Sequence, residues 1–516
     1  MLVLCSILYV VIAADRPSLF AAPTHSGFFP GWMAGPLGGL WPGLTRNGTT
    51  LRWMFTGGLV VMYGCYLAAL ACVPSLRLNA RWVVATIVAM HLVFFLAPPL
   101  SLTDIFNYIN YGRMEVVHQL NPYTTYPILE PHSDPSYALS NWHELLSPYG
   151  PLFTLFTFAL VPLGVAGSFW AIKVVMMLAS LGLILLVWKC AKLLGRDPVR
   201  AIMLVGLNPI VIVWGLGGDH NDFLTVFAIV LGLYLLLRAG ATRALVGGRG
   251  VAGPDDGQSG DPGVGHSNGR ASAKLALPGP LDGAPVWDTW RGPLRTLPRR
   301  VGAWLWPLSG AEIGAGAALV AAAALKASAG ILIPIVLAAL LRSPRRSLQF
   351  VIGLLAAGIA LGVASLIAFG LHIPDLATQS RLVTNISIPN LAGLAIGTGG
   401  ETEGLHYVLT AALLLTVIAS CLMAWRRHDA ITPAGWSTVA LLVTLGWVLP
   451  WYILWLLPLA ALSQSKRLRT TALALGAYLI IAWAPASGLV WTAIHFHPDK
   501  TPLGRLHQRY VKELLN

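Results

Sequence analysis

Asp104 follows an apolar run that ends in two prolines, and it opens the segment DIFNYINYGRM. If residues 102–117 form a helix, spacings of three, four and seven place Asp104, Asn107, Tyr108 and Tyr111 on one face. A carboxylate sheltered by aromatic rings at a membrane interface could accept a proton from a sugar hydroxyl, which is general-base chemistry. The alternative is that Asp104 only caps the N-terminus of this helix, where Asp is favoured.

A second polar group interrupts two long apolar runs in the segment VWGLGGDHNDFLTVF. It consists of Asp219, His220, Asn221 and Asp222. Ionisable residues within membrane segments are costly and usually face a cavity, although a tight turn can be polar simply because it is wet. Such a turn could hold a metal, a phosphate or sugar hydroxyls. The spacing is not diagnostic of a metal, and we predict none.

Two cations and an aromatic pair complete the set of candidate residues. Lys326 lies between two short apolar stretches, beside the expected N-terminus of the next helix, where it would suit a lipid phosphate or would only snorkel to the interface. Arg381 is the only Lys or Arg of the loop 371–404 and is a second phosphate candidate. Trp451 and Tyr452 break another apolar run, and aromatic rings at an interface either anchor the helix or stack on sugars.

The composition indicates the elements that must position these residues. Of 516 residues, 56% are hydrophobic and only 11% are charged, which is more apolar surface than a soluble domain can bury. The apolar runs of about 15 to 23 residues are close to the length needed to cross a bilayer as a helix. We therefore predict an all-α polytopic integral membrane protein with about 11 to 14 membrane helices.

The formal net charge of +13 does not indicate a nucleic-acid partner, because the basic residues lie in short tethers between apolar runs. Such clusters mark the cytoplasmic ends of membrane helices. They are Arg77 with Arg81, the group from Lys189 to Arg200, Arg342 to Arg346, Arg426 with Arg427, and Lys466 to Arg469. This orientation predicts that the loop 101–150, the turn 217–222, the loop 371–404 and the turn 450–452 all lie on the outer side of the plasma membrane.

Residues 241–300 are rich in Gly, Pro, Ala, Asp and Ser and lack the apolar residues needed to form a core. We predict a disordered cytoplasmic linker here. It would separate an N-terminal transmembrane block, residues 1–240 with the catalytic outer loop 101–150, from a C-terminal transmembrane block, residues 301–516. Within the first block, residues 151–163 are predicted to form a shallow or re-entrant helix broken at Pro162 and Gly164.

Five motifs follow one another between about residues 100 and 460. They are TDIFNYINYGRM with NPY downstream, SPYGPL, NPIVIVWGLGGDHND, LKASAGILIP and LPWYILWLLPLA. In this order the sequence resembles the polyprenyl-phosphate-mannose-dependent α-mannosyltransferases of the actinobacterial cell envelope, which are integral membrane enzymes of the GT-C fold. Within that group its length and pattern most resemble the α-(1→6)-mannosyltransferases that extend the mannan backbone of lipomannan and lipoarabinomannan.

The resemblance implies an inverting transfer of mannose at the outer (periplasmic) face of the membrane. By motif position Asp104 would be the catalytic base, with Lys326, Arg381 and His220 at the donor phosphate. Asp104 follows the third apolar run and not the first, which departs from the simplest GT-C layout and implies extra N-terminal helices. The expected substrate-binding residues are Asn107, Tyr108, Tyr111, Asn121, Tyr123, Asp219, Asn221, Asp222, Trp451 and Tyr452.

The expected partners are polyprenyl-phosphate-mannose, a lipid-anchored mannan acceptor and membrane lipid, with no cofactor, metal or nucleic acid. Three alternatives stay open. The chain could transfer arabinofuranose or glucose from the equivalent polyprenyl phosphate. It could be a secondary transporter, whose broken helices also carry charged residues, although these should lie at mid-depth in the membrane. It could also be a non-catalytic scaffold or a flippase.

Overall fold

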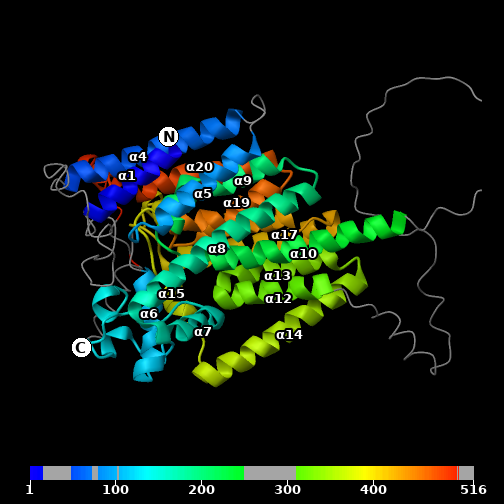
Figure 1. The fold of residues 1–516 in the computed structure, drawn as a ribbon, viewed down its shortest axis with the longest axis horizontal. Helices are drawn as coiled ribbons and strands as arrows, with labels where there is room; N and C mark the ends of the chain where they lie inside the picture. The colour runs from blue at the N-terminus through cyan, green and yellow to red at the C-terminus, as the bar shows by residue number, and fades with distance from the viewer. Residues whose placement is uncertain are drawn as a thin grey trace, which may run out of the picture.

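The computed structural model describes residues 1–15, 48–72, 79–100, 104–248 and 310–496, together with Pro498 and Pro502. Arg77 and most of the predicted linker, residues 249–300, lie outside the described residues. The described residues form a bundle of helices with irregular loops gathered at one end (Figure 1).

The N-terminal half contributes α1 (Leu2–Asp15), α4 (Gly48–Cys72), α5 (Ala80–Phe95), α6 (Asp104–His118), α7 (Pro151–Leu160), α8 (Gly164–Leu193), α9 (Pro198–Gly206) and α10 (Asp222–Gly248). The C-terminal half contributes α12 (Gly310–Leu325), α13 (Leu332–Leu340), α14 (Pro344–Phe369), α15 (Leu376–Ser380), α16 (Ile388–Ala395), α17 (Glu403–Arg427), α18 (Ile431–Thr444), α19 (Ile453–Leu462), α20 (Lys466–Trp483) and α21 (Ser487–Ala493). The helix α10 reaches into the first residues of the predicted linker.

Five helical stretches of the described chain are long and apolar enough to cross a membrane: α4, α10, α14, α17 and the stretch Pro151–Leu193, which comprises α7, a 3-10 turn and α8. The number is seven if each of two bent helix pairs counts as one span, and six further apolar helices have 10–17 residues. The chain is thus an all-α multi-pass membrane protein. The predicted 11 to 14 membrane helices are reached only if the shorter apolar helices also count as spans.

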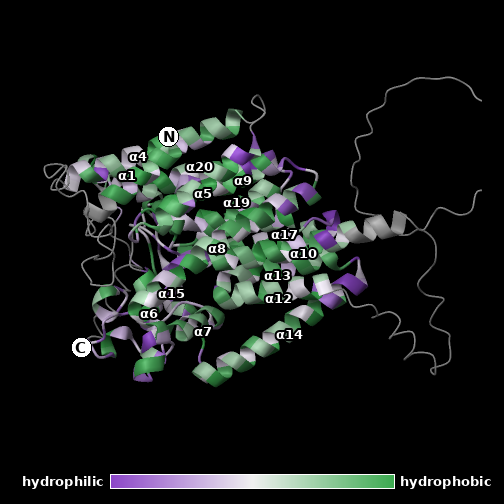
Figure 2. Ribbon diagram, in the orientation of Figure 1, coloured by the Kyte–Doolittle hydropathy of each residue, from purple (hydrophilic) through white to green (hydrophobic). Residues whose placement is uncertain are grey.

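The centre of the bundle is α19, whose residues are all buried. A helix that is apolar on every side belongs in the interior, and α19 contacts α8, α9, α10, α18 and α20. At the periphery, only 11% of the most apolar window of α14 and of α17 is buried, which leaves both helices facing lipid. Figure 2 shows mostly hydrophobic ribbon along the helices, with hydrophilic residues gathered toward their ends.

The basic clusters of the described residues lie toward one end of the bundle, which we call the basic end (Figure 2). There the end of α13 meets the end of α17, and Arg342 Nη1 lies 3.2 Å from His428 Nε2. The opposite end, the loop end, carries α6, the loop 119–150, α15 and α16 (Figure 1).

Several helices are interrupted at the loop end. A π-helical turn, Ile210–Leu216, follows α9, and 3-10 turns occupy Ala327–Ile331 and Pro450–Tyr452. The predicted break at Pro162 and Gly164 is confirmed, because a 3-10 turn, Val161–Leu163, and the positive φ of Gly164 (70°) separate α7 from α8. Several polar residues of the candidate site lie at or next to these interruptions.

Candidate active site

Asp104 is the first residue of α6, and its carboxylate meets two side chains from other segments. Oδ2 lies 3.1 Å from Nδ1 of His220, and Oδ1 accepts a 3.2 Å hydrogen bond from the indole nitrogen of Trp142. Burial acts to raise the pKa of Asp104, but His220, Trp142 and the charge of Lys326 outweigh it and hold the pKa below its usual value. The carboxylate is therefore ionised at neutral pH, as a general base requires.

The turn 217–221 holds His220 against Asp104. The imidazole stacks on the indole of Trp451, with ring centroids 3.5 Å apart and planes at 11°. A side chain at Gly218 would collide with the imidazole, so this position requires glycine. Asp219 has a φ of 54°, a left-handed conformation that Asp adopts more readily than most residues. The conformation of the predicted polar turn is therefore fixed by Gly218, by the left-handed Asp219 and by the stacking of His220 on Trp451.

Asp219 itself points away from Asp104, into the bundle. Its Oδ2 lies 3.0 Å from Nζ of Lys173, which also donates to the carbonyl of Phe94 at 3.3 Å. Lys173 lies on α8 and is 1% exposed. A buried charge that loses its partner is strongly destabilising, so this ion pair ties the turn to α8. Asp219 was predicted to bind substrate, and in the structure its carboxylate contacts Lys173.

A second ion pair involves Asp222, the last residue of the polar segment. Lys326 Nζ is 2.8 Å from Oδ1 of Asp222, and the same oxygen accepts a 2.6 Å hydrogen bond from the indole of Trp455. The ammonium also lies 4.4 Å from the ring centroid of Tyr452, within the range of a cation–π contact. The Lys326 side chain retains 19% exposure. Lys326 and the aromatic residue Tyr452, both predicted site residues, are thus in contact.

The polar face of α6 holds the neighbouring segments in place. Asn107 Oδ1 accepts hydrogen bonds from the backbone N–H groups of Asn141 (3.0 Å) and Trp142 (3.3 Å). Tyr108 accepts a 3.3 Å bond from the backbone N–H of Asn221, and Tyr111 donates to the carbonyl of Leu145 at 2.9 Å. These three predicted substrate-binding side chains bind protein atoms in the structure.

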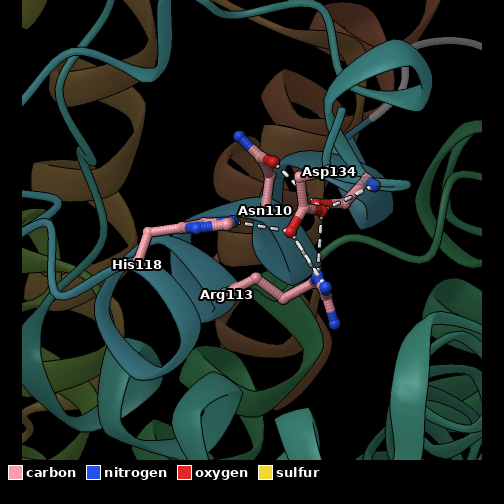
Figure 3. Close-up of polar contacts among 5 residues, drawn as sticks. Asn110, Arg113, His118 and Asp134 are labelled. Atoms are coloured by element: carbon pink, nitrogen blue, oxygen red, sulfur yellow. Dashed lines mark hydrogen bonds and ion pairs between the residues drawn. The ribbon is translucent and has the colours of Figure 1, made fainter. Parts of the chain in front are cut away.

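Farther along α6, a group of side chains fixes the loop 119–150. Arg113 donates two 2.9 Å bonds to the Asp134 carboxylate, and His118 Nε2 lies 2.8 Å from it. The Ser136 hydroxyl lies 2.7 Å from an oxygen of Asp134 and 2.7 Å from the amide oxygen of Asn110, and it can donate its one hydrogen to either. Figure 3 shows the α6 side chains converging on Asp134. We call this group the Asp134 clamp. With the bonds of Asn107, it fixes the loop at two points of α6.

The remaining predicted site residues lie elsewhere. Asn121 donates to the carbonyl of Phe369 at 3.0 Å, and the hydroxyl of Tyr123 lies 3.0 Å from that of Thr154 on α7, so both tie the loop to the bundle. Arg381 follows α15 and is exposed, and its side chain makes no hydrogen bond or ion pair within the described part of the chain. The structure does not join Arg381 to Lys326.

Three buried polar groups near Asp104 lack a hydrogen-bond partner among the described residues. They are Nε2 of His220, both amide atoms of Asn221, and the hydroxyl of Thr225 one turn further along α10. Each residue is at most 1% exposed. Buried polar groups are nearly always paired, so a cluster of unpaired ones indicates a place where a polar ligand binds. Asn221 is one of the predicted substrate-binding residues, and its role stays a prediction.

Comparison with known proteins identifies the family. Residues 18–254 match the model of the α-(1→6)-mannopyranosyltransferase N-terminal domain, and residues 387–496 match that of the MptB C-terminal domain. The two matches leave the central segment uncovered but include α6, the turn 217–221 and the Trp451 segment. The chain belongs to the α-(1→6)-mannopyranosyltransferase family. It is a membrane glycosyltransferase of the GT-C type.

Two proteins of Mycobacterium tuberculosis are each 26% identical to the present chain. One is named α-(1→6)-mannopyranosyltransferase A and aligns over 78% of this chain and 71% of its own length. The other, also named an α-(1→6)-mannopyranosyltransferase, aligns over 74% and 66%. α-(1→6)-Mannopyranosyltransferase A of Corynebacterium glutamicum is 28% identical over 30% of this chain and 32% of its own length. No solved structure matches the chain.

Several residues of the candidate site were not predicted from the sequence. Lys173 carried a usable signal, because an ionisable residue inside a long apolar run indicates function or a buried partner. Trp142, Trp455 and Thr225 carried none, since nothing in the spacing shows that they meet Asp104, Asp222 or Asn221 in space. The described residues contain no group of three or more His, Cys, Asp or Glu that could hold a metal ion.

Proposed function

We propose that this protein transfers mannose from polyprenyl-phosphate-mannose to a growing α-(1→6)-mannan acceptor of lipomannan or lipoarabinomannan. The names of its relatives support the sugar and the linkage. One observation carries the proposal. The ionised Asp104 and the Lys326 ammonium lie against the same short segment, residues 219–222, through His220 and Asp222 respectively. A carboxylate and an ammonium group are thereby held at one cluster of aromatic rings, and we assign them the roles of base and phosphate-binding cation.

In the proposed reaction, Asp104 accepts the proton of the acceptor hydroxyl as its oxygen attacks the anomeric carbon of the donor. The bond from that carbon to the phosphate oxygen breaks, and its electron pair leaves with polyprenyl phosphate. Lys326 stabilises the charge on the leaving phosphate. A β-linked donor then yields an α product by one displacement with inversion.

His220 acts in this scheme by holding the base. It lies between the Asp104 carboxylate and the Trp451 ring, so the carboxylate has a fixed orientation before substrate arrives. Fixed dipoles and charges cost no reorganisation during the reaction. The sequence-based assignment of His220 to the donor phosphate is therefore replaced in our proposal by a positioning role.

The loop end is proposed to face the outside of the plasma membrane. The clusters of Lys and Arg lie at the other end, and such clusters favour the cytoplasmic side. A glycan acceptor on the cell exterior and a donor with its lipid in the outer leaflet would then both reach Asp104. No metal or cofactor is proposed, because the donor carries a single phosphate next to Lys326.

The test is the substitution Asp104→Asn, which keeps the shape of the side chain and removes its basicity. The purified variant is expected to insert and fold like the wild type, and to lose at least about 100-fold in the rate of mannose transfer from radiolabelled polyprenyl-phosphate-mannose to an α-(1→6)-oligomannoside, as loss of a general base requires.

Asp197→Asn is the matched control. Asp197 is exposed at the basic end and caps α9, a role that Asn also performs. Full activity of Asp104→Asn would exclude Asp104 as the base. Linkage analysis of the product tests the sugar and the bond. Arabinose or glucose transfer by the wild type, with no mannose transfer, would favour the other sugars considered above.

A further inference from the structure

Trp142 and Trp447 form an aromatic pair beside the Asp104 carboxylate. Their ring centroids are 5.9 Å apart, with planes at 76° in an edge-to-face arrangement. Both side chains are partly exposed, whereas Trp451, which stacks on His220, is 2% exposed. An edge-to-face pair leaves ring surface open to a ligand. Partly exposed indoles next to an ionised carboxylate are a combination that suits a sugar, which has apolar C–H faces and polar hydroxyls.

The backbone on both sides of Trp447 is fixed. The Gly446 carbonyl accepts a 2.9 Å bond from the N–H of Thr384, and the Val448 carbonyl accepts a 3.1 Å bond from the indole of Trp483. A Cβ at Gly446 would lie 2.6 Å from Oε2 of the buried Glu401, so the chain passes close to that carboxylate. Trp447 therefore lies in a bend between α18 and the turn 450–452, and the backbone is held on both sides of it.

Trp142 is fixed as well. Its backbone N–H donates to Asn107, its indole N–H donates to Asp104, and the Asp134 clamp holds the same loop to α6. A tryptophan that only anchors a helix in the lipid interface needs none of these bonds. The two indoles thus meet the requirement for a binding site, that its side chains are held in place before the ligand arrives.

The pair and Lys326 reach Asp104 through different contacts. One carboxylate oxygen of Asp104 contacts Trp142 and the other contacts His220. Beyond His220, the contacts continue through Trp451 and Tyr452 to Lys326. In an inverting displacement the nucleophile approaches the anomeric carbon from the side opposite to the leaving phosphate. With the phosphate at Lys326, the acceptor must enter from the Asp104 side.

We propose that Trp142 and Trp447 form the acceptor subsite, in which the indoles stack on the terminal mannopyranose of an α-(1→6)-mannoside. The subsite rests on the proposed function. It adds the place and the chemistry of acceptor recognition: apolar contact with the pyranose ring from two tryptophans, while the attacking hydroxyl reaches Asp104.

The test measures the KM for a synthetic octyl α-(1→6)-dimannoside with polyprenyl-phosphate-mannose as the donor. Trp447→Leu is expected to raise the acceptor KM by about 3- to 10-fold, the size of a lost aromatic stack, with the donor KM unchanged. Trp447→Phe keeps a ring and is expected to lie between the wild type and Trp447→Leu. Trp53→Leu is the matched control, because Trp53 is half exposed on α4 and makes no contact with the site.

Trp142→Phe separates the two roles of Trp142, since it keeps a ring but loses the N–H bond to Asp104. It is expected to lower kcat and to move the acid limb of the pH–rate profile to higher pH, because that bond helps to hold the pKa of Asp104 down. An unchanged acid limb would show that the indole N–H does not position the base, and would overturn this part of the proposal.

Binding is measured apart from turnover in the inactive Asp104→Asn protein, by quenching of tryptophan fluorescence with the dimannoside. Loss of the signal in Asp104→Asn/Trp447→Leu supports the subsite, and an unchanged signal overturns it. If the wild type transfers mannose but Trp447→Leu has an unchanged acceptor KM, the subsite is wrong and the proposed function stands. If the wild type transfers no mannose, the proposed function fails, and with it the subsite as assigned.

Discussion

The three carboxylates in and around the turn 217–222 each have a different cationic or imidazole partner. Asp104 contacts His220, Asp219 pairs with Lys173, and Asp222 pairs with Lys326. Asp219, His220 and Asp222 therefore point in different directions, each toward its own ionisable partner. Since an unpaired buried charge is strongly destabilising, these contacts fix the turn as well as supplying its chemistry.

Lys326→Met is expected to raise the KM for polyprenyl-phosphate-mannose by about 10-fold or more, because a charge-assisted bond to the phosphate is lost. Lys326→Arg keeps the charge and should retain part of the donor affinity. Arg381→Met serves as the comparison, since Arg381 is exposed and has no side-chain contact in the described chain. Steady-state kinetics with varied donor measure all three. Equal donor KM in Lys326→Met and the wild type would remove Lys326 from the phosphate site.

The sequence predicted the kinds of residue in the site better than their contacts. Asp104, the turn 217–222, Lys326 and the aromatic pair at 451–452 all stood out as polar or aromatic breaks in apolar runs, and the structure brings them together. Their partners did not stand out. Trp142 lies 38 residues from Asp104 along the chain, and a contact between residues so far apart depends on the path of the whole loop. Arg381 also stood out by type, yet the structure leaves it exposed.

Among the elements, α6 has two separate tasks. Its first turns carry Asp104 and Asn107, and its later turns carry Arg113 and His118, which hold the loop through Asp134. The helix itself was predictable from its spacing, and the breaks at Pro162 and Pro450 from the prolines. The π-helical turn at Ile210–Leu216 was not, because its residues are apolar and differ in no obvious way from the helix before them.

Glu130 gives the loop 119–150 a pH-dependent stability. Burial, with the nearby charge of Asp134, raises the pKa of Glu130 to about 7. An unfolded Glu ionises near pH 4.3, so between about pH 4 and 7 the unfolded chain binds fewer protons than the folded chain, and stability falls as pH rises. Glu130→Gln removes the ionisable group and with it this loss of stability at high pH. Its Tm in detergent is expected to exceed that of the wild type at pH 8 and to match it at pH 4.5.

Glu144→Gln is the control for this effect, because Glu144 lies in the same loop and is only partly buried. It should leave the Tm nearly unchanged at both pH values. A wild-type Tm that does not depend on Glu130 between pH 4.5 and 8 would show that this carboxylate is not protonated in the folded loop.

In the whole molecule, the two predicted transmembrane blocks form one bundle. The helix α10 from the first block packs on α12 from the second, and the central α19 of the second packs on α8 and α9 of the first. The change in composition at residues 241–300 marks a boundary along the chain, but the packing crosses it. Sequence patterns show which faces are apolar, and they do not show which apolar faces meet.

The attachment of α14 to this bundle depends on two glycines. A Cβ at Gly353 would collide with the carbonyl oxygen of Ile313, and a Cβ at Gly316 would collide with that of Phe350. The clashing atoms are backbone, so no side chain can move aside, and α12 and α14 would have to separate. Since little of α14 is buried elsewhere, this crossing contributes much of what holds the helix in place.

Gly353→Ala is therefore expected to destabilise the protein by about 1–3 kcal/mol, the usual range for overpacking, and to lower its Tm in detergent. Gly362→Ala is the matched control on the same helix. A Cβ at Gly362 has no atom within 4 Å, and Ala is favoured over Gly inside a helix, so its Tm should stay equal or rise slightly. If both variants melt together with the wild type, the two helices have room to separate at no cost, and close backbone contact is not what attaches α14. If Gly353→Ala alone melts early but keeps its acceptor KM, the crossing supports the bundle without shaping the site.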